Sequence, residues 1–125
     1  VVGDGKQTRD FTFVSDVVDA FVTAARSNVA QEVFNIGSGK PVSVNRIVEL
    51  LKGDAVNIPK RPGEPDCTHA DISKAAKLLQ WKPRVSIEEG VSILLKNSHY
   101  WEKAPVWTPD SIAVATKEWF QYLGK

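Results

Sequence analysis

The chain has 125 residues, of which 42% are hydrophobic, and its 16 Lys and Arg residues against 15 Asp and Glu residues give a net charge of +1. This balance favours neither nucleic acid nor an anionic membrane as a partner, so any anion must be bound locally. A single cysteine excludes an internal disulfide, and no apolar run reaches the roughly 20 residues of a membrane span. We therefore expect a cytoplasmic protein with one compact core.

Apolar spacing predicts a mixture of short strands and helices in the first half of the chain. One strand is expected to end at residue 2, and two others are expected to cover residues 10–14 and 32–36. Helices are expected over residues 15–28 and 44–52. Ser15 and Asp16 are placed to begin the first helix. Ser43 is placed as the N-cap of the second helix, which Gly53 ends.

The second half is expected to be mostly helical after a proline-rich loop. Three prolines exclude a helix over residues 59–65, because each lacks an amide donor and restricts the residue before it. A short strand is expected before this loop at residues 55–58, and helices are expected after it over residues 71–81, 86–104 and 108–123. Asp71 caps the first of these helices, and Ser86 with Glu89 forms a capping box for the second. Pro109 occupies the first turn of the third helix.

Two arginines stand where loops meet regular structure, and each has a carboxylate within three residues. Arg9 follows a polar turn and precedes Asp10, whereas Arg61 opens an Arg-Pro-Gly-Glu sequence that ends at Glu64. Planar, permanently charged guanidinium groups held by carboxylates suit a diphosphate, so the two arginines are predicted to form a clamp. A surface ion pair between Arg9 and Asp10 is the simpler alternative.

Other candidate sites are weaker. Cys67, His69 and Asp71 would share one face of an extended segment, but Asp71 is already needed as a helix cap, so no metal site is expected. Six aromatic side chains near the carboxyl end are spaced as on two amphipathic helices, which favours a core or a subunit interface over a stacking platform for sugar or nucleic acid. They are Tyr100, Trp101, Trp107, Trp119, Phe120 and Tyr122.

Five stretches resemble, in this order, successive parts of the extended short-chain dehydrogenases. They are residues 3–14 (GDGKQTRDFTFV), 16–20 (DVVDA), 34–39 (FNIGSG), 61–64 (RPGE) and 70–75 (ADISKA). Together they are similar to the carboxy-terminal part of NAD-dependent nucleotide-sugar epimerases and dehydratases, over about residues 1–96. An ordered series of motifs is far more specific than any one motif.

The resemblance implies that Arg9 contacts the diphosphate or nucleoside of a nucleotide-sugar, and that Arg61 reaches the same diphosphate from the opposite loop. It places Glu64 at the ribose hydroxyls, since a carboxylate can accept two hydrogen bonds, and Phe11 beside the base. The implied parent reaction is transient oxidation of a sugar hydroxyl by bound NAD, followed by epimerisation or elimination. The base, the sugar and the choice among epimerase, dehydratase and decarboxylase stay open.

The catalytic features of that family do not occur in these 125 residues. Its glycine-rich NAD turn needs a third glycine where Thr8 stands. Its catalytic tyrosine is followed by a lysine four residues later, but Ala104 follows Tyr100 at that distance, and Tyr122 lies too close to the end. We therefore expect no catalytic residues, no NAD binding and no turnover from this chain alone, and we expect both tyrosines to be partly buried.

The expected fold is α/β: a partial Rossmann-type extended short-chain dehydrogenase, mainly its carboxy-terminal substrate-binding portion, with short strands and about five helices. Residues 1–96 are expected to form the substrate-binding portion, and residues 97–125 a helical extension packed on the same domain.

A start at Val1 and a lack of methionine indicate the tail of a longer protein. The expected partners are then a nucleotide-diphosphate sugar, an amino-terminal Rossmann half and, through exposed apolar faces, a second copy of the chain. Neither nucleic acid nor a membrane is expected. The alternatives are a stand-alone module that binds a nucleotide or a protein without catalysis, and an inactive remnant.

Overall fold

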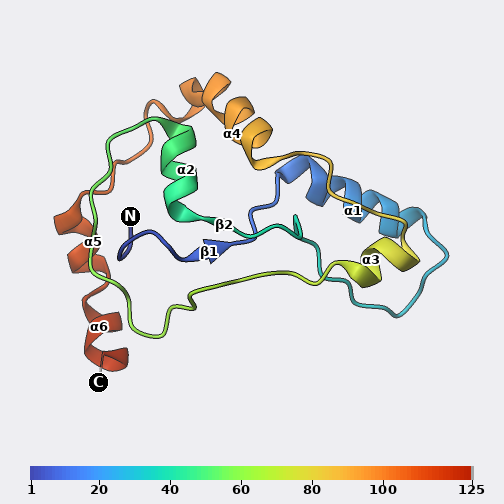
Figure 1. Ribbon diagram of the computed structural model, residues 1–125, viewed down its shortest axis with the longest axis horizontal. Helices are drawn as coiled ribbons and strands as arrows, with labels where there is room; N and C mark the ends of the chain where they lie inside the picture. Colours follow the sequence, from blue (N-terminus) through green and yellow to red (C-terminus); the bar gives the residue numbers. More distant parts are fainter. Residues whose placement is uncertain (125) are drawn as a thin grey trace.

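The computed structural model describes residues 1–124, which form six α-helices, one 3₁₀ helix and one two-stranded sheet. In chain order the elements are β1 (Thr8–Arg9), α1 (Val14–Arg26), β2 (Val42–Ser43), α2 (Val44–Leu51), α3 (Ser73–Leu78), α4 (Ile87–Lys96), η1 (Ser98–Trp101), α5 (Pro109–Ala115) and α6 (Lys117–Leu123). Figure 1 shows β1 and β2 near the middle, with α1 and α3 at one end of the molecule and α5 and α6 at the other. The predicted α/β class with short strands is confirmed.

The strand β1 lies between two segments that are distant from it in the sequence. It pairs antiparallel with β2, with Thr8 opposite Ser43. On its other side the Thr8 amide donates to the Asp66 carbonyl at 2.9 Å, and the Thr68 amide donates to the Thr8 carbonyl at 3.1 Å. Three segments, β1, β2 and residues 66–68, therefore meet around Arg9, the second residue of β1.

The strands predicted from alternation at residues 10–14 and 32–36 are wrong. Residues 10–13 lead directly into α1, and residues 32–36 form no strand within the described chain. An alternating pattern of side chains indicates which face of a strand would be buried. It does not show that a neighbouring strand is present to pair with the backbone donors and acceptors. Val33 is accordingly 83% exposed. Of the strand expected at 55–58, the structure shows only an isolated parallel bridge between Ile58 and Val2.

Two helices begin at the predicted caps, but the described residues show no return bond from the Glu89 side chain, so the predicted capping box is only half formed. The Ser43 hydroxyl accepts a hydrogen bond from the Arg46 amide at 3.2 Å at the start of α2, and the Ser86 hydroxyl accepts one from the Glu89 amide at 3.2 Å at the start of α4. Each bond satisfies one of the amides that a helix leaves unpaired in its first turn. The end of α2 differs by one residue from the prediction, because Lys52 rather than Gly53 adopts the left-handed conformation, with φ of 55°.

Four helices depart from their predicted bounds, because α3 ends at Leu78 rather than near residue 81 and α4 ends at Lys96 rather than near residue 104, and α1 and the last predicted helix differ as follows. The first, α1, begins at Val14 with no side-chain cap. Asp16 is instead a buried acceptor for the backbone amides of Arg84 and Val85, at 3.1 and 3.0 Å. The last predicted helix is divided into α5 and α6 at Thr116, whose hydroxyl donates back to the Ile112 carbonyl at 2.8 Å. Such back-bonding bends or interrupts helices.

The buried core lies at the end of the molecule that contains α1 and α3. Ala20, Ala75, Leu79 and Trp81 form one cluster, in which Ala75 is fully buried. By contrast, α5 and α6 contain no buried residue. No helix in residues 1–124 is long and apolar enough to cross a membrane.

Candidate functional site

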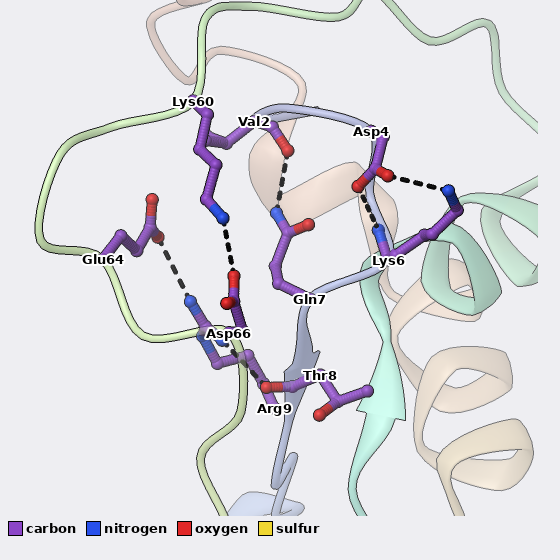
Figure 2. Close-up of polar contacts among 9 residues, drawn as sticks. All are labelled: Val2, Asp4, Lys6, Gln7, Thr8, Arg9, Lys60, Glu64 and Asp66. Carbon is purple, nitrogen blue, oxygen red and sulfur yellow. Dashed lines mark hydrogen bonds and ion pairs between the residues drawn. The ribbon is translucent and has the colours of Figure 1, made fainter.

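The guanidinium of Arg9 is held at the end of β1 by two contacts (Figure 2). One nitrogen donates to the Thr8 carbonyl at 2.8 Å, and another lies 3.3 Å from Oε1 of Glu64. The Arg9 and Glu64 side chains are 22% and 24% exposed, so this ion pair is half-buried. A charged pair in this setting is screened by solvent less than a fully exposed one. Two of the predicted site residues, 55 positions apart, are thus in contact.

Arg61 and Glu64 stand at the two ends of a tight turn. The Glu64 amide donates to the Arg61 carbonyl at 3.4 Å, and Gly63 has φ of 73°. Pro62 followed by a glycine with positive φ matches a type II turn, in which the first and fourth residues lie within about 7 Å at Cα. The turn therefore places the backbone of Arg61 close to the residue that contacts Arg9.

The Arg61 guanidinium itself lies over the Trp119 ring of α6. Its central carbon is 5.7 Å from the ring centroid, which is within the range of a cation–π contact. The indole Nε1 of Trp119 also donates to the Pro62 carbonyl at 2.8 Å. Within residues 1–124, Arg61 takes part in no ion pair, so the carboxylate predicted to hold it, Glu64, holds Arg9 instead.

Phe11 occupies a different part of the surface. It is 37% exposed and lines a hollow together with Val85 and Ile87, at the start of α4. Among the cavities of the described chain, the one beside the Arg9–Glu64 pair does not include Phe11. The structure therefore places Arg9 and Glu64 together, whereas the Arg61 side chain lies against α6 and lines a separate hollow with Ile112 and Phe120, and Phe11 lies elsewhere.

A cavity of about 220 Å³ lies between the turn that precedes β1 and the proline-rich loop. Figure 2 shows the side chains that face each other there. Lys60 pairs with Asp66 at 2.7 Å, and Lys6 pairs with Asp4 at 3.0 Å. The hydrogen bond to Asp66 raises the pKa of Lys60 above its usual value. Both lysines that line this cavity are thus paired with carboxylates, and of the predicted site residues only Glu64 lines it.

Asp10, the predicted partner of Arg9, serves a different purpose. Its carboxylate accepts hydrogen bonds from the backbone amides of Ser38, Gly39 and Ala70, at 2.6, 3.3 and 3.0 Å. Burial alone would raise the pKa of Asp10, but the hydrogen bonds from Ser38 and then from the backbone outweigh it and leave the pKa below its ordinary value. Asp10 thus ties two loops to the end of β1, a role that sequence reasoning missed.

Two of the glycines allow close internal packing. A Cβ at Gly5 would overlap the side chain of Asn45, and one at Gly37 would lie 2.6 Å from Oδ2 of Asp10. These close approaches are made by other parts of the same chain, so Gly5 and Gly37 leave no open space for a pyrophosphate.

The remaining candidates are also clarified by the structure. Tyr100 and Tyr122 are 78% and 71% exposed, so the prediction that they are partly buried is wrong, and Trp107, 66% exposed, shows that the aromatic group is not a core. Cys67 is an exposed free thiol. The Asp71 carboxylate accepts from the Ser73 amide at 2.9 Å as α3 begins, and the hydrogen bonds with Ser73 lower its pKa.

Comparison with known proteins gives consistent matches. A model of the NAD dependent epimerase/dehydratase family matches residues 1–37. The UDP-glucuronate 4-epimerase of Thermodesulfobacterium geofontis is 38% identical over 91% of this chain and 36% of its own length. The crystal structure of UDP-glucose 4-epimerase from Thermotoga maritima with UDP-glucose has a TM-score of 0.73, at 36% identity, over 80% of this chain and 34% of that one.

A third match is the crystal structure of the Bacillus cereus UDP-glucuronic acid 4-epimerase Y149F mutant, in complex with UDP-4-deoxy-4-fluoro-glucuronic acid and NAD. Its TM-score is 0.65, at 39% identity, over 73% of this chain and 32% of that one. The chain thus spans about a third of the length of each of these proteins. The ordered motifs, the α/β fold and these matches agree, and the chain belongs to the NAD-dependent epimerase/dehydratase family, whose carboxy-terminal part it matches.

Proposed function

We propose that this chain is the substrate-binding, carboxy-terminal portion of an NAD-dependent nucleotide-sugar epimerase or 4,6-dehydratase, in which Arg9 and Arg61 bind the diphosphate. The observation that carries the proposal is the contact between Arg9 and Glu64 across two distant loops. The type II turn then brings the backbone of Arg61 to the same region. A diphosphate has oxygens on two neighbouring phosphorus atoms, which suits two separate guanidinium groups.

Glu64 has a second function in the proposed site. Only its Oε1 contacts Arg9, through one nitrogen of the guanidinium at 3.3 Å. The other oxygen can accept hydrogen bonds from a ribose diol, while the in-plane donors of Arg9 that face away from Glu64 can reach phosphate. Since the relatives named above act on or bind UDP-sugars, a uridine nucleotide is the first ligand to test. Phe11 is proposed to pack beside the base.

Residues 1–96 are proposed to supply this site and residues 97–125 to pack on it as a helical extension. Two contacts support that division for the described residues: the Trp119 hydrogen bond to Pro62 and the cation–π contact of Arg61 with Trp119. NAD and the proton-transferring residues would come from another part of the enzyme, because these 125 residues contain neither a three-glycine turn nor a tyrosine with a lysine four residues later. The chain alone is therefore proposed to bind substrate without turning it over.

The proposal is tested by calorimetric titration of UDP-glucose into the wild-type chain, Arg9→Ala and Arg61→Ala. Loss of one charge-assisted contact to phosphate should weaken binding by about tenfold to a hundredfold. Arg26→Ala is the matched control, since Arg26 is an exposed cation at the end of α1. Absence of UDP-glucose binding by the wild-type chain, or equal affinities for all four proteins, would contradict the proposal.

A further inference from the structure

The carboxy-terminal helix α6 contacts the turn that carries Arg61. Trp119 makes two distinct contacts there: its Nε1 donates to the Pro62 carbonyl at 2.8 Å, and its ring lies 5.7 Å from the guanidinium carbon of Arg61. Gly124, at the end of the same helix, also lies against the Pro62 ring, since a Cβ built there would be 3.6 Å from Cγ of Pro62. Thus α6 contacts both the backbone carbonyl of Pro62 and the side chain of Arg61.

The geometry of the Arg61 contact matters for its chemistry. The Trp119 ring lies 5.7 Å from the guanidinium carbon and offers no carboxylate oxygen to the five N–H donors of Arg61. This cation–π contact therefore restricts the rotamers of Arg61 without pairing its charge. Within residues 1–124 no carboxylate pairs with Arg61, in contrast to Arg9, Arg46, Lys60 and Lys74. Arg61 is thus held by a neutral partner and keeps its charge and donors available.

We propose that Trp119 is a positioning residue for the nucleotide-diphosphate site: it fixes the turn through Pro62 and presents the in-plane donors of Arg61 to phosphate. The inference rests on the proposed function and extends it, because it assigns a role in substrate binding to the helical extension. Trp119 acts through Arg61 and does not touch the ligand itself. Less rotamer freedom is lost on binding when the side chain is already held in place.

The first test is independent of any ligand. In a ¹⁵N-labelled 125-residue chain, the indole N–H signals of Trp119 and Trp107 are assigned with Trp→Phe variants. We expect slow solvent exchange at the Trp119 indole, because it is hydrogen-bonded, and fast exchange at Trp107, whose side chain is 66% exposed. Arg61→Ala should shift the Trp119 signal and leave the Trp107 signal in place. Equally fast exchange at both indoles, with no response to Arg61→Ala, would overturn the proposal.

The second test measures the affinity for UDP by calorimetry. Trp119→Ala should weaken binding by about threefold to tenfold, because it removes both the ring and the hydrogen bond. Trp119→Phe keeps a ring without the N–H and should have an intermediate effect. Trp107→Ala removes the same group from an exposed position of the same extension and should bind like the wild-type chain. Far-UV circular dichroism of each variant shows whether α6 is retained.

The UDP affinities distinguish a failure of the role of Trp119 from a failure of the proposed substrate site. If the wild-type chain binds UDP and Trp119→Ala binds it equally well, the role of Trp119 is wrong and the proposed site stands. If the wild-type chain does not bind UDP, the proposed function fails for this chain and the inference fails with it. A loss of affinity in Trp119→Phe that is as large as in Trp119→Ala would assign the effect to the Pro62 hydrogen bond and overturn the role of the cation–π contact.

Discussion

The two ends of the molecule are stabilised in different ways. At the end that contains α1 and α3, Ala20, Ala75, Leu79 and Trp81 pack into a buried cluster. At the other end, α5 and α6 contain no buried residue, and α6 contacts the proline-rich loop through Trp119. Figure 1 shows that β1 and β2, which carry Arg9 and Ser43, lie between these two ends.

The buried cluster at one end therefore stabilises the fold, whereas the contacts of α6 at the other end set the geometry of the proposed site. Burial of apolar surface is non-directional and contributes most of the free energy of folding, whereas a cation–π contact or a single hydrogen bond is weak and directional. Substitutions in the cluster should therefore lower the free energy of unfolding. Substitutions near α6 should instead change the position of the Arg61 turn and leave the core intact.

The largest effect is expected from removal of a core aromatic residue. Trp81→Ala should lower the free energy of unfolding by about 3–5 kcal/mol, because a large buried side chain is lost and a cavity remains. Urea denaturation measures the change. Trp107→Ala makes the same chemical substitution at a 66% exposed site and should cost less than about 0.5 kcal/mol. Equal costs at the two positions would contradict the proposed difference between the ends.

A smaller loss is expected at the junction between the two ends. Asp10→Asn should lower the free energy of unfolding by about 1–3 kcal/mol at neutral pH, because three backbone amides lose a charged acceptor. The folded state lowers the pKa of Asp10 from 3.8, so its contribution is present above that value and is lost as the pH falls through the folded pKa.

Thermal unfolding of the wild-type chain and Asp10→Asn between pH 7 and pH 2 checks this. The difference in Tm should be largest near neutral pH and should shrink below pH 3.8. A difference that is constant across this range would show that the carboxylate charge of Asp10 is not what holds the loops.

The ion pair of the candidate site should have an intermediate coupling energy. A double-mutant cycle of Arg9→Ala and Glu64→Ala, measured by urea unfolding, should give about 1 kcal/mol, since both side chains are half-buried. The exposed pair of Lys6 with Asp4 is the control and should give about 0.5 kcal/mol or less. No coupling between Arg9 and Glu64 would remove the contact on which the proposed site rests.

The smallest effect on global unfolding is expected at the far end of the extension. Thr108→Ala removes the cap that accepts from the Ser111 amide at 3.2 Å. Because α5 has no buried residue, the loss should appear as local fraying of α5, with less than about 0.5 kcal/mol of change in global stability. Hydrogen exchange at the Ser111 amide should accelerate. A fall in the global unfolding midpoint as large as for Asp10→Asn would show that α5 unfolds together with the core.

Local features were the easiest to predict from the sequence. The caps at Ser43 and Ser86 involve residues three positions apart, so their spacing alone indicates them. The Pro62–Gly63 turn is predictable for the same reason. The prediction of a strand at residues 32–36 was wrong because a strand needs a neighbouring strand to pair with, and alternation does not indicate which segment provides it.

Only some of the long-range contacts could be predicted from the sequence. The ordered motifs associated Arg9 with Glu64, and the structure places them in contact. Nothing in their local sequence indicates that Asp10 accepts from Ala70, 60 positions away, or that Trp119 donates to Pro62, 57 positions away. Helical periodicity showed that α6 has an apolar face, but not what that face contacts.

The central claim is that Arg9 and Arg61 together bind the diphosphate of a nucleotide. The most direct measurement compares UDP with uridine, which lacks the phosphates, by calorimetry on the wild-type chain and on Arg9→Ala/Arg61→Ala. We expect the wild-type chain to prefer UDP by about a hundredfold or more, and the double variant to lose most of that preference while its weaker affinity for uridine is unchanged. Equal affinities of the wild-type chain for UDP and uridine, or an undiminished preference in the double variant, would contradict the claim.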